Sequence, residues 1–509
     1  MFLRAVSSGA VPNHYPSAEP PAAGPHRAPV PPRADRFHEA ADVAPLAEVA
    51  SGPASDPISL AGLEACVEEA RLAALAPGDG PAVPTAFASL RGRLEAAREK
   101  LPPLYQRAVA NPLLASLEDL GARGLARLLA EDPEREGAAG LFLDLAQAVL
   151  QRAEGHQARA TAAFQEVVSD LYEGFLSAED RRGVKPPDHG VAAPLVRWGS
   201  AEDGPYTWPA TDTAVFGAEA AVVSLPAANA SAGLLAWPAL AHETAGHDVL
   251  AADEGLHDEL ARTVRARLLA EKLSPAVVDY WAKRIDETAS DVLGVLNMGP
   301  AAAVGLVGYF RALNGAWGGT PSLRTVGPAE DPHPADIVRA YVAAETVRLL
   351  SFEGAARWAD RLIAEADRDL GRIRLGGVAV TAATAKASAA AVARAIVRTP
   401  LRALEGRALG DVQDWKDRDE AVVAELRRAL AGGTAEVGAA AGKFVRGAYA
   451  AHAVAAGVYE AVGGRSNPSQ VMGRMIDLLA AMHERNPGWK VPRSTPSRLR
   501  GSPGEPMLA

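Results

Sequence analysis

Residues 241–248 of this chain read AHETAGHD, and residues 284–294 read RIDETASDVLG. The first stretch places two imidazoles and a carboxylate, those of His242, Glu243 and His247, within about one and a half turns of a helix. The second stretch sets acids beside apolar residues, and acids rarely enter apolar surroundings without a partner. Together the two stretches predict a helical protein built around a metal site.

The spacing of the two histidines does not suit an ideal α-helix. His242 and His247 are five residues apart, which places them about 140° apart around a helix of about 3.6 residues per turn. A π-bulge, with its i→i+5 hydrogen bonds, returns such residues to one face and is frequent at functional sites. Gly246 lowers the steric cost of that distortion. We therefore predict a widened turn at Ala245–His247.

The third metal ligand is expected on the second helix. A catalytic zinc usually has three protein ligands and one position left for water. Glu287 is the predicted ligand, and Asp286 could take its place. The plain structural alternative for Glu287 is a position on a solvated face or a salt bridge to Arg284 or Lys283. Asp286 and Asp291 are otherwise expected to accept hydrogen bonds from the two imidazoles and to orient them.

The same residues form a pair of motifs that resembles those of the dipeptidyl peptidase III family of zinc exopeptidases, over roughly residues 237–295. The motifs read His242-Glu243-x-x-Gly246-His247 and Asp286-Glu287-x-x-x-Asp291. The resemblance implies that Glu243 is the general base of a zinc metallopeptidase. It also implies roles for the other residues, with zinc ligands at His242, His247 and Glu287 and supporting acids at Asp286 and Asp291.

The expected reaction is the hydrolysis of a peptide bond. Zinc would polarise the scissile carbonyl and lower the pKa of a bound water, and Glu243 would pass the proton of that water to the leaving amine. The strand candidate at residues 220–225 is expected to pair with an extended peptide. Three residues remain open as stabilisers of the oxyanion, with His333 ahead of Tyr309 and Tyr341.

The rest of the chain indicates a mainly α fold, which we expect to be a multi-helix, zincin-like metallohydrolase. Apolar residues recur at three- and four-residue spacing in residues 60–75, 87–101 and 141–176, and a long helix is expected from Ser274–Pro275. The best strand candidate, residues 218–226, precedes the histidine motif. The predicted units are a disordered Pro/Ala-rich tail (1–57), a helical domain (58–184), a zinc-binding catalytic region (185–335), a C-terminal helical region (336–490) and a flexible tail (491–509).

Composition excludes several classes of partner and site. The formal net charge is -10 and no block of Lys and Arg occurs, so nucleic acid is not an expected partner. Cys66 is the single cysteine, so a metal must be bound by histidines and carboxylates. The uncharged runs at residues 220–241 and 292–310 contain Pro, Asn and Gly, which favours burial in a core over a membrane span.

The amino terminus lacks the apolar stretch of a secretory signal, so a cytoplasmic location is expected, with specialised export left open. The Pro/Ala-rich tail could dock to a partner. Two other functions remain as alternatives. One is a catalytically inactive helical scaffold or delivered cargo protein with a structural zinc, and the other is an oxidative non-heme iron enzyme. The natural substrate and the choice between endo- and exopeptidase stay open.

Overall fold

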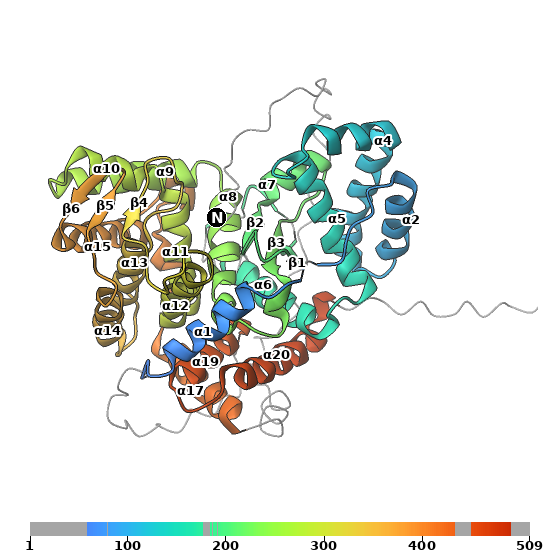
Figure 1. Cartoon of the computed structure of the whole chain (residues 1–509). Coiled ribbons are helices and arrows are strands. Elements are labelled where there is room, and N and C mark those ends of the chain that lie inside the picture. The colour runs from blue at the N-terminus through green and yellow to red at the C-terminus, as the bar shows by residue number, and fades with distance from the viewer. Residues whose placement is uncertain are drawn as a thin grey trace, which may run out of the picture.

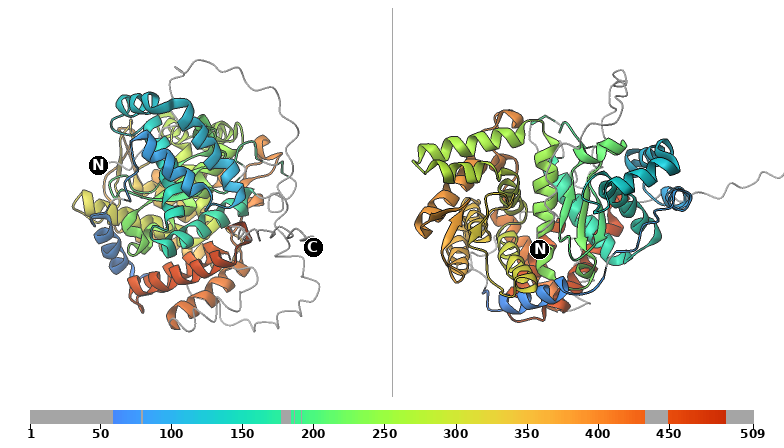
Figure 2. Two further views of the ribbon diagram at one scale, coloured as in Figure 1. Left: turned by 90° about the vertical axis from the view of Figure 1, so that its right-hand side faces the viewer. Right: turned by 45° about the horizontal axis from the view of Figure 1, so that its top comes forward.

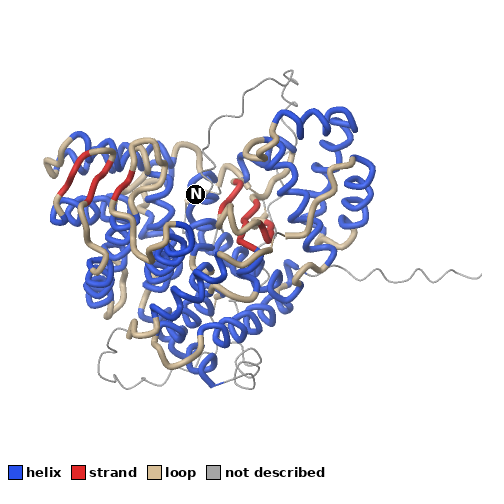
Figure 3. The backbone as a smooth tube through the Cα atoms, in the orientation of Figure 1, coloured by secondary structure: helices blue, strands red, loops and turns tan. Residues whose placement is uncertain are grey.

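The structure is a computed structural model, and the predicted mainly α fold is confirmed in it (Figures 1 and 3). In the described part of the chain the strands form two small three-stranded sheets, which lie apart from each other among the helices (Figure 3). The predicted tails at 1–57 and 491–509 fall outside the described part of the chain. The described residues are 59–78, 80–176, 184–185, 187–190, 192–432 and 449–489.

The elements follow one another along the chain with helices before, between and after the two sheets. The first half contains α1 (Leu63–Ala74), α2 (Phe87–Arg98), α3 (Pro103–Tyr105), η2 (Gln106–Ala110), α4 (Asn111–Glu131), α5 (Ala138–Glu154), α6 (Ala158–Leu176), β1 (Leu195–Gly199), β2 (Tyr206–Trp208), α7 (Ala210–Thr213), η3 (Ala214–Phe216), β3 (Val222–Pro226), η4 (Ala227–Ala230), η5 (Leu234–Ala236), η6 (Ala241–Asp248) and α8 (Val249–Ala252). The second half contains α9 (Leu256–Ala270), α10 (Pro275–Ala282), α11 (Ile285–Met298), α12 (Pro300–Trp317), β4 (Val326–Gly327), α13 (Asp336–Arg348), α14 (Ala355–Asp367), β5 (Ile373–Leu375), β6 (Val378–Val380), α15 (Ala382–Arg398), η7 (Arg402–Leu404), α16 (Leu409–Val412), α17 (Asp417–Gly432), α19 (Ala450–Val462), α20 (Pro468–Arg485) and η8 (Pro487–Trp489).

Two hydrophobic cores hold these elements together. One is formed by buried residues from Leu60 to Met482, and the other by residues from Leu90 to Trp489. Segments from the two ends of the described chain therefore share each core. Helix α1 contacts α19 and α20, and Figure 2 shows these blue and red segments along one side of the molecule.

The strand expected before the histidine motif exists, but its predicted role as a peptide-pairing strand is wrong. β3 is the central strand of the order β1-β3-β2, with β1 parallel to it and β2 antiparallel to it. Both of its edges already make ladder hydrogen bonds, so no peptide can add to it. β1 and β2 are the two edge strands of this sheet, and each pairs with β3 along one side only.

The long helix expected from Ser274–Pro275 is two helices. α10 ends at Ala282, Arg284 leaves helical geometry at φ -115° and ψ 27°, and α11 starts at Ile285. The Arg284 guanidinium donates to the carbonyls of Pro328 and Ala329 in a distant loop, at 2.6 Å and 3.0 Å, which ties this junction to the rest of the fold. Asp286 and Glu287 consequently stand in the first turn of a new helix, where the helix dipole favours negative charge.

The two long apolar runs are also interrupted. Residues 220–241 contain β3 and two short 3-10 helices, and residues 292–310 are divided between α11 and α12 at Gly299. No helix in the described part of the chain is long and apolar enough to cross a membrane.

Candidate metal centre

The histidine motif adopts the distorted geometry that its spacing predicts. η6 is a π-helix, and it extends over Ala241–Asp248, beyond the three residues expected to widen. The i→i+5 bonding turns His242 and His247 to one face, where their ring centroids lie 4.8 Å apart. Their Nε2 atoms are separated by 3.1 Å. The predicted π-distortion is confirmed.

Gly246 serves a different purpose from the one expected. Its φ lies outside the left-handed region, so the π-helix does not require the backbone freedom of glycine at this position. A Cβ atom here would lie 2.4 Å from Cβ and 2.6 Å from Cα of Ser290 on α11. Gly246 is therefore needed because η6 and α11 approach each other closely, and this approach brings the histidines to the acids of α11.

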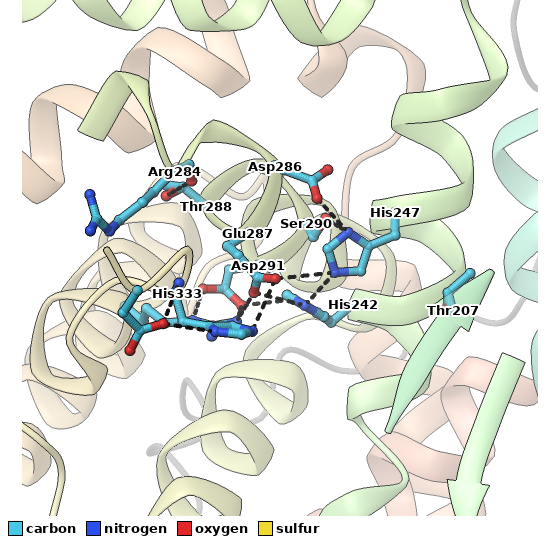
Figure 4. A network of polar contacts seen from close by, with 12 residues as sticks. Thr207, His242, His247, Arg284, Asp286, Glu287, Thr288, Ser290, Asp291 and His333 are labelled. Carbon is cyan, nitrogen blue, oxygen red and sulfur yellow. Dashed lines mark hydrogen bonds and ion pairs between the residues drawn. The ribbon is translucent and has the colours of Figure 1, made fainter. Parts of the chain in front are cut away.

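The acids of α11 converge on the two imidazoles from the opposite side (Figure 4). Glu287 turns Oε2 toward His242 Nε2, at 3.5 Å, and Oε1 toward His247 Nε2, at 3.6 Å. Asp291 Oδ1 lies 2.9 Å from His242 Nδ1, and Asp286 Oδ2 lies 3.1 Å from His247 Nδ1. Five of the six side chains named from the sequence are thus brought together, and the sixth, Glu243, lies beside the two histidines. The salt bridge considered between Glu287 and Arg284 is not formed, since that arginine donates to loop carbonyls.

This arrangement fixes the tautomers of both rings. Each Nδ1 faces a carboxylate, which accepts hydrogen bonds but cannot donate them when ionised, so each Nδ1 carries a proton. When the rings are neutral, the Nε2 atoms of His242 and His247 then carry lone pairs that point toward the same region. Lone pairs 3.1 Å apart repel each other unless a proton or a metal ion lies with them. Imidazoles oriented by carboxylates in this way are characteristic of metal sites.

The donor set fits zinc. Tetrahedral zinc with ligands at about 2.0–2.2 Å holds neighbouring donor atoms roughly 3.3–3.6 Å apart. The contacts among the two Nε2 atoms and the Glu287 carboxylate span 3.1–3.6 Å. Ligand atoms of His242, Glu243 and His247 also lie within 4.8 Å of one another, as do those of His247, Asp286 and Glu287. Glu287 is the carboxylate that faces both rings, which favours it over Asp286 and Glu243 as the third ligand.

The electrostatics of the site favour a cation. Burial lowers the pKa of His242, but the hydrogen bonds to Asp291 and Glu287 outweigh it and raise the pKa to about 9. Burial likewise lowers the pKa of His247, and the charge of Asp286 with its hydrogen bond outweighs it and raises the pKa to about 10. Burial raises the pKa of Glu287, yet the neighbouring charges, that of His333 first, hold it well below its ordinary value. The carboxylates thus remain ionised around the rings.

Glu243 has a partner that the sequence did not reveal. Its side chain is buried, and Oε2 accepts a hydrogen bond from Thr207 Oγ1 at 2.9 Å. Thr207 lies on β2, more than thirty positions before the motif, and a lone threonine in a loop-rich segment gives no signal of this contact. The hydrogen bond orients the carboxylate beside the two histidines.

Of the three candidate oxyanion stabilisers, two line the cavity at this site and one does not. His333 has Nε2 at 3.4 Å from Glu287 Oε1 and Nδ1 at 3.1 Å from Asp331 Oδ1. Tyr309 also lines the cavity, and burial and the charge of Glu243 raise its pKa. Tyr341 is excluded because its hydroxyl donates to Asp367 at 2.7 Å, away from the cavity.

Arg339 is a second residue missed from the sequence. It is 4% exposed and forms ion pairs with Asp291 and Glu287. A signal was present, because α13 is otherwise a run of buried and mostly apolar residues, and an arginine is rarely placed on such a helix without buried acids to pair with.

A cavity of about 750 Å³ opens at the centre. Its walls come from β2, η6, α11 and α12, and it reaches the site through Glu243 and His247. A smaller cavity of about 240 Å³ shares Phe310, His333 and Arg339 with it, and continues to Trp317 near the end of α12. The site is thus open to a ligand larger than water.

Comparisons with protein-family models, curated proteins and solved structures found no match for this chain. The resemblance to the dipeptidyl peptidase III family therefore stays a prediction from the two motifs.

Proposed function

We propose that this protein is a zinc-dependent hydrolase, and specifically a metallopeptidase, with zinc held by His242, His247 and Glu287. The observation that carries the proposal is the convergence of two Nε2 atoms, 3.1 Å apart, on a carboxylate that faces both rings. A further buried carboxylate, Glu243, stands on the same π-helix and lines the cavity. A metal with a free carboxylate beside it is the arrangement that activates water.

Each residue then has a defined part in the reaction. Zinc, when bound, supplies Lewis acidity toward a water molecule and a carbonyl oxygen. Glu243 accepts the proton from water and delivers it to the leaving nitrogen, while Thr207 Oγ1, which lies 2.9 Å from Oε2 and 3.1 Å from the Glu243 carbonyl oxygen, helps to orient the carboxylate. His333 and Tyr309 stand in the cavity wall, where hydrogen-bond donors can stabilise the charge that develops on the carbonyl oxygen.

A peptide is the substrate class that the cavity suits best. The cavity of about 750 Å³ has the size of a site for a molecule of several residues. Pro205, Tyr206 and Thr207 line it, so β2, an edge strand of its sheet, borders the space beside Glu243. An extended peptide can add to such an edge through main-chain hydrogen bonds, which place a scissile carbonyl without regard to sequence.

The alternative functions are less well supported. A structural zinc is usually enclosed by four protein ligands, whereas a large cavity adjoins these three. Non-heme iron also takes two histidines and a carboxylate, but a general base next to the first histidine is a feature of hydrolysis.

The test is metal analysis and peptide cleavage on purified wild type, His247→Ala and Glu243→Gln. We expect one zinc per wild-type chain, loss of zinc in the histidine variant, and retention of zinc with loss of cleavage in the glutamate variant. His257→Ala and Glu254→Gln are matched controls, because both residues line the same cavity and their side chains are at least half exposed. Stoichiometric zinc without cleavage of any peptide in a mixed library would support the scaffold, and absence of zinc from wild type would overturn the proposal.

A further inference from the structure

Arg339 brings a buried positive charge to the metal centre that the proposed reaction does not use. Its Nε and Nη2 atoms donate to the two oxygens of Asp291 at 2.7 Å and 2.8 Å. Nη2 also lies 3.2 Å from Oε2 of Glu287. One planar guanidinium therefore contacts an acid that orients His242 and the carboxylate that faces both imidazoles.

These contacts connect α13 with the ligands on α11 and η6. Asp291 Oδ1 accepts a hydrogen bond from Arg339 Nη2 and another from His242 Nδ1, at 2.8 Å and 2.9 Å. The guanidinium itself is held over the ring of Phe310, with Cζ 4.7 Å from the ring centroid. Arg339 can therefore restrict the rotation of Asp291, and through it the plane of the His242 ring.

We propose that Arg339 is a positioning residue of the zinc site, which holds Asp291 and Glu287 in the orientations that metal binding requires. This inference rests on the proposed zinc site. The role depends on the shape of the guanidinium, because its fixed fork of donors matches the two oxygens of one carboxylate, whereas an ammonium group is a point charge.

The positive charge of Arg339 and the hydrogen bonds of Arg339 have opposite effects on zinc affinity. A positive charge close to the ion repels it, so loss of the charge alone would strengthen zinc binding. Loss of the hydrogen bonds releases the ligand and its supporting acid, and such changes around a metal typically weaken binding by about 10- to 100-fold. Whether substitution of Arg339 strengthens or weakens zinc binding therefore shows which of the two effects dominates.

The experiment measures the zinc dissociation constant of full-length wild type, Arg339→Met and Arg339→Lys by competition with a chromophoric chelator. We expect both variants to bind zinc about 10- to 100-fold more weakly than wild type, since lysine keeps the charge but not the fork. We also expect the visible spectrum of the cobalt(II)-loaded lysine variant to differ from that of wild type, because the spectrum reports ligand geometry.

Arg311→Met is the matched control. Arg311 is 5% exposed and also pairs with two carboxylates, Glu365 and Asp369, but it does not contact the metal centre. Zinc affinity is expected to remain within about twofold of wild type in this variant, whatever the loss in stability. If Arg339→Met does not fold, the lysine variant decides the question.

Several results would overturn this role of Arg339. They are wild-type affinity and an unchanged cobalt spectrum in the lysine variant, tighter zinc binding in the methionine variant, or an equal loss of affinity in the Arg311 control. Failure of wild type itself to bind zinc is a different result, because it removes the proposed function and not only the contribution of Arg339.

Discussion

Zinc binding should be strongly coupled to the release of protons. The surrounding carboxylates raise the pKa values of His242 and His247 to about 9 and about 10, so we expect both rings to hold protons near neutral pH in the metal-free protein. The Glu287 oxygens lie 3.5 Å and 3.6 Å from the two Nε2 atoms, so the negative charge of this carboxylate favours protonated rings. A metal ligand must be deprotonated, so zinc displaces both protons. At pH values below both pKa values, the apparent affinity should rise by about tenfold per proton, or about 100-fold per pH unit.

The assay is chelator competition at pH 6, 7 and 8, with the protonation of the chelator taken into account. Zinc affinity is expected to rise by about 10⁴-fold between pH 6 and pH 8. Calorimetry in buffers of different ionisation enthalpy should detect the release of about two protons per zinc at pH 7. If the logarithm of the zinc affinity does not change with pH and no protons are released, the rings are neutral in the metal-free protein and the reasoning is refuted. His257→Ala serves as the control, because that ring is half exposed and lies outside the donor set.

The same pKa shifts predict the stability of the metal-free protein. A histidine with a raised pKa in the folded state stabilises that state most below its ordinary value of about 6.5. The contribution is lost as pH rises through the folded-state values of about 9 and about 10. The thermal midpoint of the metal-free protein should therefore fall between pH 7 and pH 10. Zinc should remove this contribution to the pH dependence, because the bound rings carry no proton on Nε2.

Three substitutions test other parts of the centre. Gly246→Ala places a methyl group 2.4 Å from Ser290 Cβ, so it should lower the free energy of unfolding by about 1–3 kcal/mol and weaken zinc binding. Unchanged stability and zinc affinity in this variant would contradict the close approach of η6 and α11. Thr207→Val removes the donor to Glu243 and should lower kcat roughly 10-fold with zinc retained, while Thr207→Ser should restore activity. Trp317→Ala should lower kcat/KM by about 3- to 10-fold for long peptides alone, because the residue lines the smaller cavity; an equal effect on short peptides would exclude a subsite there.

The sequence predicted those features of the structure that depend on residues close together in the chain. The helical periodicity of residues 60–75 and 87–101 predicted α1 and α2, because apolar spacing directly reports a buried helix face. The π-helix followed from two histidines five residues apart that had to share a face. The reason assigned to Gly246 was incorrect, because close packing against another helix leaves no trace in the local sequence.

The remaining features depend on contacts between distant segments. A strand pattern cannot distinguish a central strand from an edge, and β3 is central because β1 and β2 pair with it from both sides. Tyr309 and Tyr341 looked equivalent in sequence, but α12 turns one toward the cavity and α13 turns the other toward Asp367. Thr207 could be assigned only when the sheet placed β2 against η6.

The carboxylates that support His242 and His247 differ in their exposure to solvent, and this difference follows from these long-range contacts. The side chain of Asp291 is 1% exposed and is held by Arg339, whereas that of Asp286 is 48% exposed. A buried carboxylate is screened less by water than a half-exposed one. His242 is thus supported by a buried carboxylate that accepts two hydrogen bonds from Arg339, and His247 by a carboxylate that is open to solvent. For the proposed zinc site we therefore expect the His242 side to be held more firmly, whereas His247, whose ligand atom lies within 4.8 Å of that of Glu243, belongs to the side that solvent can reach.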